Sequence, residues 1–413
     1  MKTDVCIIGA GPAGLMAAIY SAKSNAQTAV VEANTAAGRK LLLTGGGRCN
    51  ITHADGINKF IKAFGTKGRF LQYCFHELKP EQVREFFAER GLETKVEKDG
   101  CVFPVTDSAE DVQKVLLSDS AKNGVHFLYD RRVEGIEKCG EGFNIRTGRE
   151  TISANKVIIA TGGISYPDTG STGDGYKFAQ KLGHTIIKPK ASLVPLITKQ
   201  TWPAELAGTA VDNVRITANP KKHKFNATGA MLFTQDGIGG PAVVDLSFSL
   251  TDYLPSIENP IEISMDMVCG IDEIELEKRI LVKFEQSPHK TLINIIAEFL
   301  PKRLATVFCR EFGFDGNIVG RQIKKDSRKK LVRTLKALPL SVTAARPIAE
   351  AMVTRGGVNI TELDPKTMGS KICRGLFFAG EVMDVDGPCG GYNLQLCWST
   401  GAIAGIAAGG GHG

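Results

Sequence analysis

A glycine turn between an apolar strand and an alanine-rich helix is the strongest constraint in this sequence. Residues 4–8 form the predicted strand, Gly9-Ala10-Gly11-Pro12-Ala13-Gly14 the turn, and residues 15–24 the helix. The order strand, G-x-G-x-x-G, helix is typical of half a doubly wound βαβ unit. It predicts a dinucleotide site, because exposed amides at the helix N-terminus bind a diphosphate.

Each part of this unit has a predicted role. Gly9 permits the tight turn, Gly11 lets the backbone approach the diphosphate, and Gly14 lets helix and strand pack closely. Glu32 ends the next strand, residues 28–32, where its carboxylate can accept hydrogen bonds from ribose hydroxyls. The alternative is a tight turn with no ligand. The unit does not separate NAD from FAD.

Three further glycine-rich segments are expected to meet the same ligand. Arg39 and Lys40 begin the loop 38–52, which continues through Thr44-Gly45-Gly46-Gly47-Arg48-Cys49-Asn50 and suits phosphate, ribityl chain and flat ring. The alternative is a mobile basic loop. Two apolar strands then end in small residues, Ala160-Thr161-Gly162-Gly163 and Ala379-Gly380-Glu381. The last helix, residues 393–408, opens at Gly390-Gly391-Tyr392, and its N-terminus would stabilise negative charge on a reduced flavin.

The pattern along the chain predicts an α/β fold, a Rossmann-like domain interrupted by two insertions. Residues 1–188 form the first part of the nucleotide domain. Residues 189–270 are β-rich and proline-punctuated, which predicts a barrel or sandwich. Residues 271–338 have helical periodicity, and residues 339–413 return to the nucleotide domain.

Composition excludes several classes of protein. The ten cysteines show neither C-x-x-C nor zinc spacing, so no metal site or disulfide framework is predicted. No run of about 18 apolar residues and no signal-peptide layout is present, and we expect a cytoplasmic chain without membrane association. The formal charge of +7 is compatible with an anionic ligand, a nucleic acid or mere solubility. Oligomeric state is not predicted.

These motifs resemble the two-dinucleotide-binding flavoproteins, and within them the BaiN/YhiN-like family of FAD-binding, NAD(P)/FAD-dependent oxidoreductases. The resemblance covers nearly the whole chain, through GAGPAGL at Gly9, GRKLLLTGGGRCNIT at Gly38, TGDGYKFAQKLGH at Thr172 and LFFAGEVMDVDGPCGGYNLQLCWSTG at Leu376. It implies FAD held by both ends of the chain. It does not imply one substrate, because activities attributed to such proteins include amine oxidation and ketone reduction.

The resemblance also implies ligand residues. At the adenosine end these are Gly9, Gly11, Ala13, Gly14, Glu32, Arg39 and Lys40, with Val133 contacting adenine through its backbone. At the flavin end they are Gly47, Arg48, Cys49, Asn50, Ala160, Thr161, Gly162, Gly380, Glu381, Asn393, Leu394 and Gln395. Many relatives carry Thr-His-x-Gly-x-Ser-Gly-Pro where this chain has residues 234–241, TQDGIGGP, so that histidine is not available as a general acid.

The preferred reaction is hydride transfer between flavin and a small amine, ketone or enone, with oxygen or the substrate as acceptor. Tyr392 and Arg355 are candidates for substrate contact, against packing and a solvated charge as alternatives. A second G-x-G-x-x-G is absent, so NAD(P)H is considered only as a transient donor. Other classes are an RNA-binding or tRNA-modifying flavoprotein, suggested by the basic helix 321–336 although nucleic acid is disfavoured, and a flavin sensor without turnover.

Overall fold

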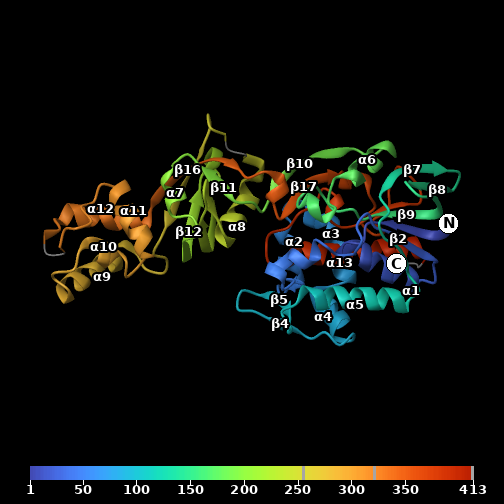
Figure 1. Ribbon diagram of the computed structural model, residues 1–413, viewed down its shortest axis with the longest axis horizontal. Coiled ribbons are helices and arrows are strands. Elements are labelled where there is room, and N and C mark those ends of the chain that lie inside the picture. The colour runs from blue at the N-terminus through green and yellow to red at the C-terminus, as the bar shows by residue number, and fades with distance from the viewer. Residues whose placement is uncertain (254–255, 320–321, 411–413) are drawn as a thin grey trace. The chain divides into compact units, whose positions relative to one another are not determined.

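The computed structural model describes residues 1–253, 256–319 and 322–410. Its chain divides into two compact units (Figure 1), unit 1 with residues 1–190 and 348–413 and unit 2 with residues 191–347. Within the described residues, no helix is long and apolar enough to cross a membrane. Each unit has its own core of buried apolar side chains.

A mixed seven-stranded sheet forms the centre of unit 1, with the order β6-β2-β1-β9-β8-β7 and β18 paired to β9. Its strands are β1 (Lys2–Ile8), β2 (Thr28–Val31), β6 (His126–Leu128), β7 (Val133–Cys139), β8 (Gly142–Thr147), β9 (Thr151–Ile159) and β18 (Leu376–Phe378). The strands β6, β2, β1, β9 and β18 are parallel, as the βαβ pattern predicts. β9 is long enough to pair antiparallel with β8 through one half and parallel with β18 through the other.

The other elements of unit 1 surround this sheet. A small sheet contains β3 (Thr52–His53), β5 (Cys101–Pro104) and β4 (Thr94–Val96), and β10 (Ile186–Ser192) pairs with β17 (Val353–Val358). The helices are α1 (Pro12–Lys23), α2 (Ile57–Ala63), α3 (Gly68–Glu77), α4 (Pro80–Ala88), α5 (Ala109–Lys122), α6 (Asp174–Lys181) and α13 (Tyr392–Gly409).

Helices α1 and α13 run parallel and pack backbone to backbone. Gly401, Gly405 and Gly409 face Ala13, Ala17 and Ser21 in that order, and a Cβ at these glycines would lie 2.4, 2.4 and 2.8 Å from the carbonyl oxygens opposite. Only glycine permits this approach. Since Gly401 lies opposite Ala13, α13 begins eight residues before the level at which α1 begins, which is about 12 Å at 1.5 Å per residue.

Unit 2 combines a closed barrel with a helical subdomain. The barrel order is β11-β14-β13-β12-β15-β16, with β16 closing onto β11. The elements are β11 (Leu196–Thr198), α7 (Trp202–Glu205), β12 (Ala210–Ala218), β13 (Phe225–Phe233), β14 (Gly237–Gly239), α8 (Pro241–Leu250), β15 (Ile261–Asp266), α9 (Glu273–Gln286), α10 (Leu292–Ile296), α11 (Lys302–Glu311), α12 (Lys325–Lys336) and β16 (Leu338–Ala345). Figure 1 shows α9–α12 gathered at one end of this unit.

Two sequence predictions differ from these bounds in detail. The predicted second part of the nucleotide domain starts at residue 339, but the strand 338–345 belongs to the barrel, which it closes between β11 and β15. The predicted basic helix 321–336 starts at Lys325 instead, because Lys324 is its extended N-cap residue. Arg321, which that prediction included, lies outside the described residues.

A buried histidine joins three connecting segments of unit 1. His184 Nδ1 lies 3.0 Å from Glu362 Oε2, and its Nε2 lies 2.7 Å from Ser370 Oγ. Ser370 Oγ also accepts hydrogen bonds from the backbone N–H groups of Ile372 and Cys373. Both lone pairs of that oxygen are therefore used, which identifies this Ser-His-Glu array as a structural link and not as a nucleophile. Burial lowers the pKa of His184 against the opposing effect of Glu362.

The α1–α13 contact predicts the effect of an added side chain. In Gly405→Val the new atoms meet the Ala17 carbonyl, and overpacking of this kind costs about 1–3 kcal/mol. We expect a lower melting temperature and release of bound cofactor. The matched control is Ala407→Val, two residues on at a half-exposed position of the same helix, where we expect little change. Equal melting temperatures for the two variants would contradict the packing argument.

His184 predicts a pH window for stability. Its folded pKa lies below its ordinary value of 6.5, so the unfolded chain takes up the proton first as the pH falls. The contribution to the free energy of unfolding is therefore complete above about pH 6.5 and is lost below it. Urea unfolding at pH 7.5 and 5.5 measures this loss. His184→Gln cannot titrate, and a pH dependence as steep as that of the wild type would contradict the assignment.

Candidate active site

A cavity of about 190 Å³ in unit 1 lies where the parallel strands end and α1 and α13 begin. Thirteen of the twenty ligand residues expected from the sequence line it: Gly9, Gly11, Ala13, Glu32, Arg39, Lys40, Val133, Ala160, Thr161, Gly162, Glu381, Asn393 and Leu394. They come from seven separate segments of the chain. This is the carboxyl edge of the parallel strands, where α/β folds bind ligands.

Two helix N-termini face this cavity. Gly11, Pro12 and Ala13 line it from α1, while Asn393, Leu394 and Leu396 line it from α13. The first N–H groups of a helix have no partner inside the helix, and the helix dipole adds partial positive charge there. The two ends are offset by about 12 Å along the helix axes. One end therefore suits a diphosphate, and the other suits a polar ring edge further along the same ligand.

The backbone around the cavity leaves room for a ligand to lie in close contact. The position of Gly11 has ordinary backbone angles, φ −75° and ψ −177°, and a Cβ there would meet nothing within 4 Å. Gly14 differs, because its Cβ would lie 1.9 Å from the Gly9 carbonyl oxygen. Gly14 is therefore required by the turn itself. The glycine at 11 has no such structural reason, so a ligand against the backbone explains it best.

The acidic residue at the end of β2 is held by three donors. Glu32 accepts hydrogen bonds from the backbone N–H groups of Ala10 and Asn34, both at 2.8 Å, and from Asn34 Nδ2 at 2.7 Å. Asn34 in turn accepts a bond of 2.9 Å from Arg39 Nη1. The carboxylate is 8% exposed in total and lines the cavity. Its fixed position suits the ribose hydroxyls of an adenosine.

A partly buried ion pair lines the cavity. Lys40 Nζ lies 2.8 Å from Glu381 Oε2 and 2.6 Å from Ser165 Oγ. Glu381 Oε1 accepts from the Thr354 N–H at 2.8 Å and from Ser165 Oγ at 3.0 Å. This arrangement fixes the end of β18 against the loop after β2. It places one cation and one carboxylate beside the position expected for the ribityl chain.

Seven of the expected ligand residues do not line the cavity: Gly14, Gly47, Arg48, Cys49, Asn50, Gly380 and Gln395. Arg48 forms ion pairs with Glu97 and Asp107. Gln395 is fully buried and bonds Thr52 Oγ1 and the Leu78 carbonyl. Their contacts hold the loop 44–52 and α13 in place, and any direct contact with a cofactor stays a prediction.

Two of these seven residues, Cys49 and Asn50, have structural roles in the loop 44–52. Cys49 has φ 63°, and burial raises the pKa of its thiol to about 12, which makes it unreactive as a thiolate. The amide of Asn50 bridges the loop to the last helix, since it accepts from the Gly391 N–H at 3.2 Å and donates to the Thr52 carbonyl at 3.0 Å. Asn50 therefore positions the N-terminus of α13.

The two candidates for substrate contact differ in their surroundings. The Tyr392 hydroxyl donates to Asp55 Oδ2, its ring packs among His53, Phe60 and Phe64, and burial together with Asp55 raises its pKa. A catalytic role for this hydroxyl would require it to leave Asp55, and stays a prediction.

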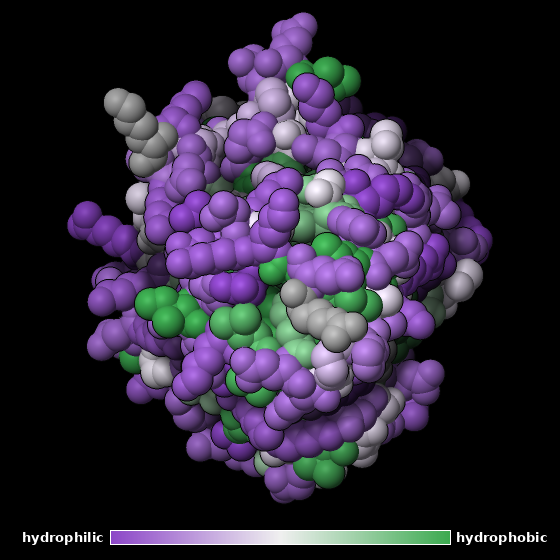
Figure 2. Space-filling model, turned by 90° about the vertical axis from the view of Figure 1, so that its left-hand side faces the viewer, coloured by the Kyte–Doolittle hydropathy of each residue, from purple (hydrophilic) through white to green (hydrophobic). Residues whose placement is uncertain are grey.

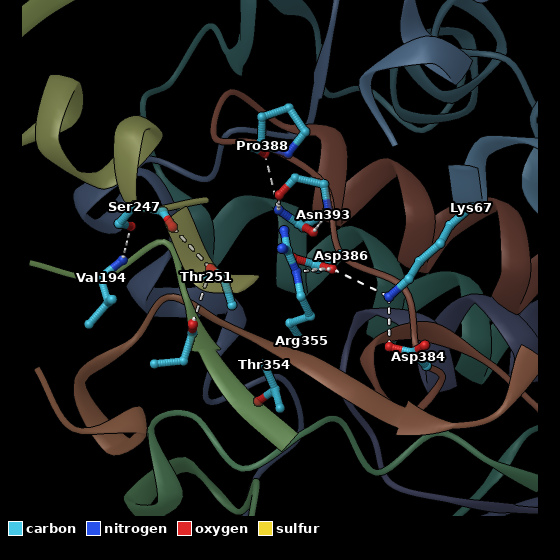
Figure 3. A network of polar contacts seen from close by, with 12 residues as sticks. Lys67, Val194, Ser247, Thr251, Thr354, Arg355, Asp384, Asp386, Pro388 and Asn393 are labelled. Carbon is cyan, nitrogen blue, oxygen red and sulfur yellow. Dashed lines mark hydrogen bonds and ion pairs between the residues drawn. The ribbon is translucent and has the colours of Figure 1, made fainter. Parts of the chain in front are cut away.

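Arg355 lies on β17 within the charged network that Figure 3 shows. Its Nε is 2.9 Å from Asp386 Oδ2, and Lys67 Nζ lies 3.8 Å from Asp386 and 2.6 Å from Asp384. The Asp386 side chain is only 2% exposed. The guanidinium of Arg355 is therefore held by a buried carboxylate that also lies near a second cation.

Sequence reasoning missed several residues of the cavity wall. The cavity is also lined by Arg131, Arg132, Ser171, Thr172 and Asp174. Burial opposes ionisation of Asp174, but hydrogen bonds from Lys177 and Thr172 and the charge of Arg132 outweigh it and lower its pKa. Only the TGDG segment signalled this group, and nothing in its spacing reveals the pairing with Arg132.

The residues present fit FAD. Unpaired amides at two helix ends suit a diphosphate and a flavin edge, the open position at Gly11 leaves room for the ligand, and Glu32 suits a ribose. Among the described residues, no group of three His, Cys, Asp or Glu side chains converges on a metal site.

Comparisons with known proteins identify the family. A family model described as HI0933-like protein Rossmann domain matches residues 3–407. A 3-dehydro-bile acid delta(4,6)-reductase of Clostridium scindens is 31% identical over 97% of this chain and 98% of its own length. Ribosomal RNA dihydrouridine synthases of Escherichia coli and Haemophilus influenzae are 30% and 32% identical, over 97% and 95% of this chain and 96% and 95% of theirs.

Solved flavoenzymes share the fold. An open flavocytochrome c3 fumarate reductase aligns with a TM-score of 0.52 at 16% identity, covering 99% of this chain and 78% of that one. A 3-ketosteroid delta1-dehydrogenase of Sterolibacterium denitrificans aligns with a TM-score of 0.53 at 12% identity, covering 99% of both chains. At this identity the likeness concerns the fold alone.

Gly11 gives a direct test of the cofactor site. Gly11→Ala adds a methyl group in open space, so we expect an unchanged melting temperature for the cofactor-free protein. The affinity for FAD should fall by at least tenfold, because the methyl group occupies the position of the diphosphate. Fluorescence titration with FAD measures this change.

The control is Gly56→Ala, at the N-cap of α2, where a Cβ also meets nothing within 4 Å. It should bind FAD normally. Wild-type affinity in Gly11→Ala would contradict the placement of the diphosphate.

Proposed function

We propose that this chain, which belongs to the HI0933-like family of FAD-binding Rossmann proteins, reduces a carbon–carbon double bond conjugated to a carbonyl group. It is an FAD-dependent oxidoreductase. The proposal concerns the bond that it reduces. Amine oxidation, an alternative suggested by the sequence, has no support among the relatives described above.

One observation carries the proposal. Full-length relatives of nearly equal identity have unlike substrates, a 3-dehydro-bile acid in one and ribosomal RNA in the others. Their names nevertheless describe one kind of reaction. A 3-oxo steroid with a double bond at position 4 and a uracil base both contain an alkene conjugated to a carbonyl. We therefore infer for this chain the reaction type that the relatives share, and neither of their substrates.

The net reaction adds two hydrogens across the double bond. Bound FAD, reduced by a reduced nicotinamide nucleotide, would supply a hydride to the carbon far from the carbonyl, and a proton from solvent would go to the carbon beside it. The donor is oxidised and the alkene reduced by the same two electrons. A protein group that donates a hydrogen bond to the carbonyl oxygen would stabilise the negative charge that forms there.

The chain's own residues would provide orientation and electrostatics. The amides at the start of α13 would face the flavin edge on which reduction places negative charge. Lys40 and Glu381 would hold the ribityl chain. Arg355, fixed through its Nε by Asp386, is our candidate for contact with the substrate carbonyl, since a guanidinium stays protonated and donates in a fixed direction.

The preference for a conjugated bond can be measured directly. The holoprotein, reduced by light without oxygen, is mixed with cyclohexenone, cyclohexanone or uridine, and return of the visible absorbance of oxidised flavin is followed. We expect reoxidation by a conjugated alkene and none by cyclohexanone. Reoxidation by the saturated ketone alone would contradict the proposal, and reoxidation by oxygen alone would favour a sensor or oxidase.

Arg355 gives a second prediction. Arg355→Lys keeps the charge beside Asp386 but loses the planar donor, so enone reduction should fall about 10²–10³-fold, the usual effect of losing one such donor. FAD affinity should not change. Arg374→Lys, at a side chain 91% exposed in the same unit, is the control and should keep its activity. Equal rates in both variants would remove Arg355 from the substrate site.

A further inference from the structure

The charge of this chain is concentrated in one segment. Residues 271–338 contain 15 Lys and Arg against 9 Asp and Glu, a net charge of +6, whereas the whole chain has +7. The preceding part of unit 2, residues 191–270, contains 5 Lys and Arg against 8 Asp and Glu, a net charge of −3. The helical subdomain is therefore basic for a reason that general solubility does not supply.

The cations of α12 fall into two groups. Three are used inside the fold. Arg328 Nε bonds Glu277 at 2.9 Å, Lys330 Nζ bonds the Phe312 carbonyl at 2.8 Å, and Lys336 Nζ bonds Asp266 at 2.6 Å. Half of the cations of α12 therefore have partners within the fold.

The second group forms an exposed row. Lys325, Lys329 and Arg333 are spaced four residues apart, so they follow one another along the outer face of α12, about 6 Å apart along its axis. All three are exposed, and none has an ion pair or side-chain hydrogen bond within the described part of the chain. We call Lys325, Lys329 and Arg333 the α12 row.

Local stability does not explain the α12 row. Like charges at i and i+4 destabilise a helix by about 0.2–0.5 kcal/mol per pair. Lys325 also lies in the first turn, where the helix dipole disfavours a cation. Repulsion within the α12 row and the helix dipole at Lys325 both lower the stability of the helix. Residues that are unfavourable for local stability are typical of functional surfaces. Figure 2 shows a face covered mostly by hydrophilic side chains, with smaller hydrophobic patches among them.

We propose that the α12 row binds the phosphate backbone of an RNA whose uracil base is the substrate of the flavin site. The inference rests on the proposed function, because uracil is a conjugated substrate that occurs within a polyanion. Regularly spaced cations without structural partners are suited to phosphates, and they would supply affinity without sequence preference. A neutral or singly charged small molecule has too few negative charges to contact all three cations of the α12 row.

The test measures RNA binding by fluorescence anisotropy of the full-length holoprotein at several salt concentrations. The probe is a labelled, uridine-containing stem-loop RNA. We expect the triple variant Lys325→Gln, Lys329→Gln and Arg333→Gln to lose at least tenfold in affinity. The slope of log affinity against log salt should fall by about 2, because each contact to a single strand contributes about 0.7.

The control has the same charge change elsewhere. Lys62→Gln, Lys98→Gln and Lys122→Gln neutralise three exposed lysines of unit 1 and also reduce the net charge by three. This variant should bind RNA like the wild type and keep its enone reduction. Equal losses in both triple variants would reduce the effect to net charge and overturn the proposal. Circular dichroism and flavin content verify folding, and the three single variants replace the triple variant if it does not fold.

Two further outcomes separate this inference from the proposed function. Reduction of cyclohexenone without binding of RNA at low salt would overturn the α12 row as an RNA site and leave the proposed function standing. Binding of RNA without reduction of any conjugated alkene would overturn the proposed function and leave the α12 row as an RNA-binding surface. Vesicles of phosphatidylserine and phosphatidylcholine are the third probe, and binding to them in place of RNA, lost in the α12 variant, would also overturn the proposal.

Discussion

The close contact between α1 and α13 is the constraint on which the site depends. Gly401, Gly405 and Gly409 bring the last helix of the chain against the first at backbone distance, and the contact sets both the direction and the offset of the two helices. Because the helices are parallel, both N-termini point to the same edge of the sheet. Because they are offset by about 12 Å, we expect them to contact two different parts of one extended ligand.

Most of the resulting electrostatics comes from the backbone. The amides at two helix ends can stabilise anionic groups without bringing side-chain charge into the cavity, and they need no reorganisation when a ligand binds. Among the charged side chains that line the cavity, Lys40 pairs with Glu381 and Arg132 with Asp174, while Arg39 donates to the Asn34 side chain. In the network of Arg355, Asp386 and Lys67, a buried carboxylate likewise lies beside cations.

The sequence predicted the parts that depend on glycine and on strand ends. Gly9, Gly11 and Glu32 could be placed, because their spacing has one physical meaning when a strand precedes and a helix follows. The contacts of Gln395 could not, since a polar residue in an apolar helix gives no sign of whether it faces a ligand or the protein. β16 was assigned to the wrong side of a boundary because strand pairing across more than a hundred residues leaves no local pattern.

The structure also separates residues that look alike in sequence. Arg328 and Lys329 are neighbours in one basic run, but among the residues that the structure describes only the first has a carboxylate partner. The same holds at the cofactor cavity, where Gly11 and Gly14 belong to one motif. Gly14 is required by the packing of the turn, whereas a Cβ at Gly11 would meet open space, so the contact of Gly11 with a ligand stays a prediction. Composition and motifs thus predict the class of site. The contacts in the structure show which of the motif residues are needed for packing and which face open space.

The most direct test of the account compares the affinities of the cofactor-free protein for FAD, FMN and ADP by isothermal titration. A ligand that spans both helix ends should bind far more tightly than either of its halves, so FAD should exceed FMN and ADP by orders of magnitude. An affinity for FMN equal to that for FAD would mean that α1 and its diphosphate contact contribute nothing, and would contradict the central claim.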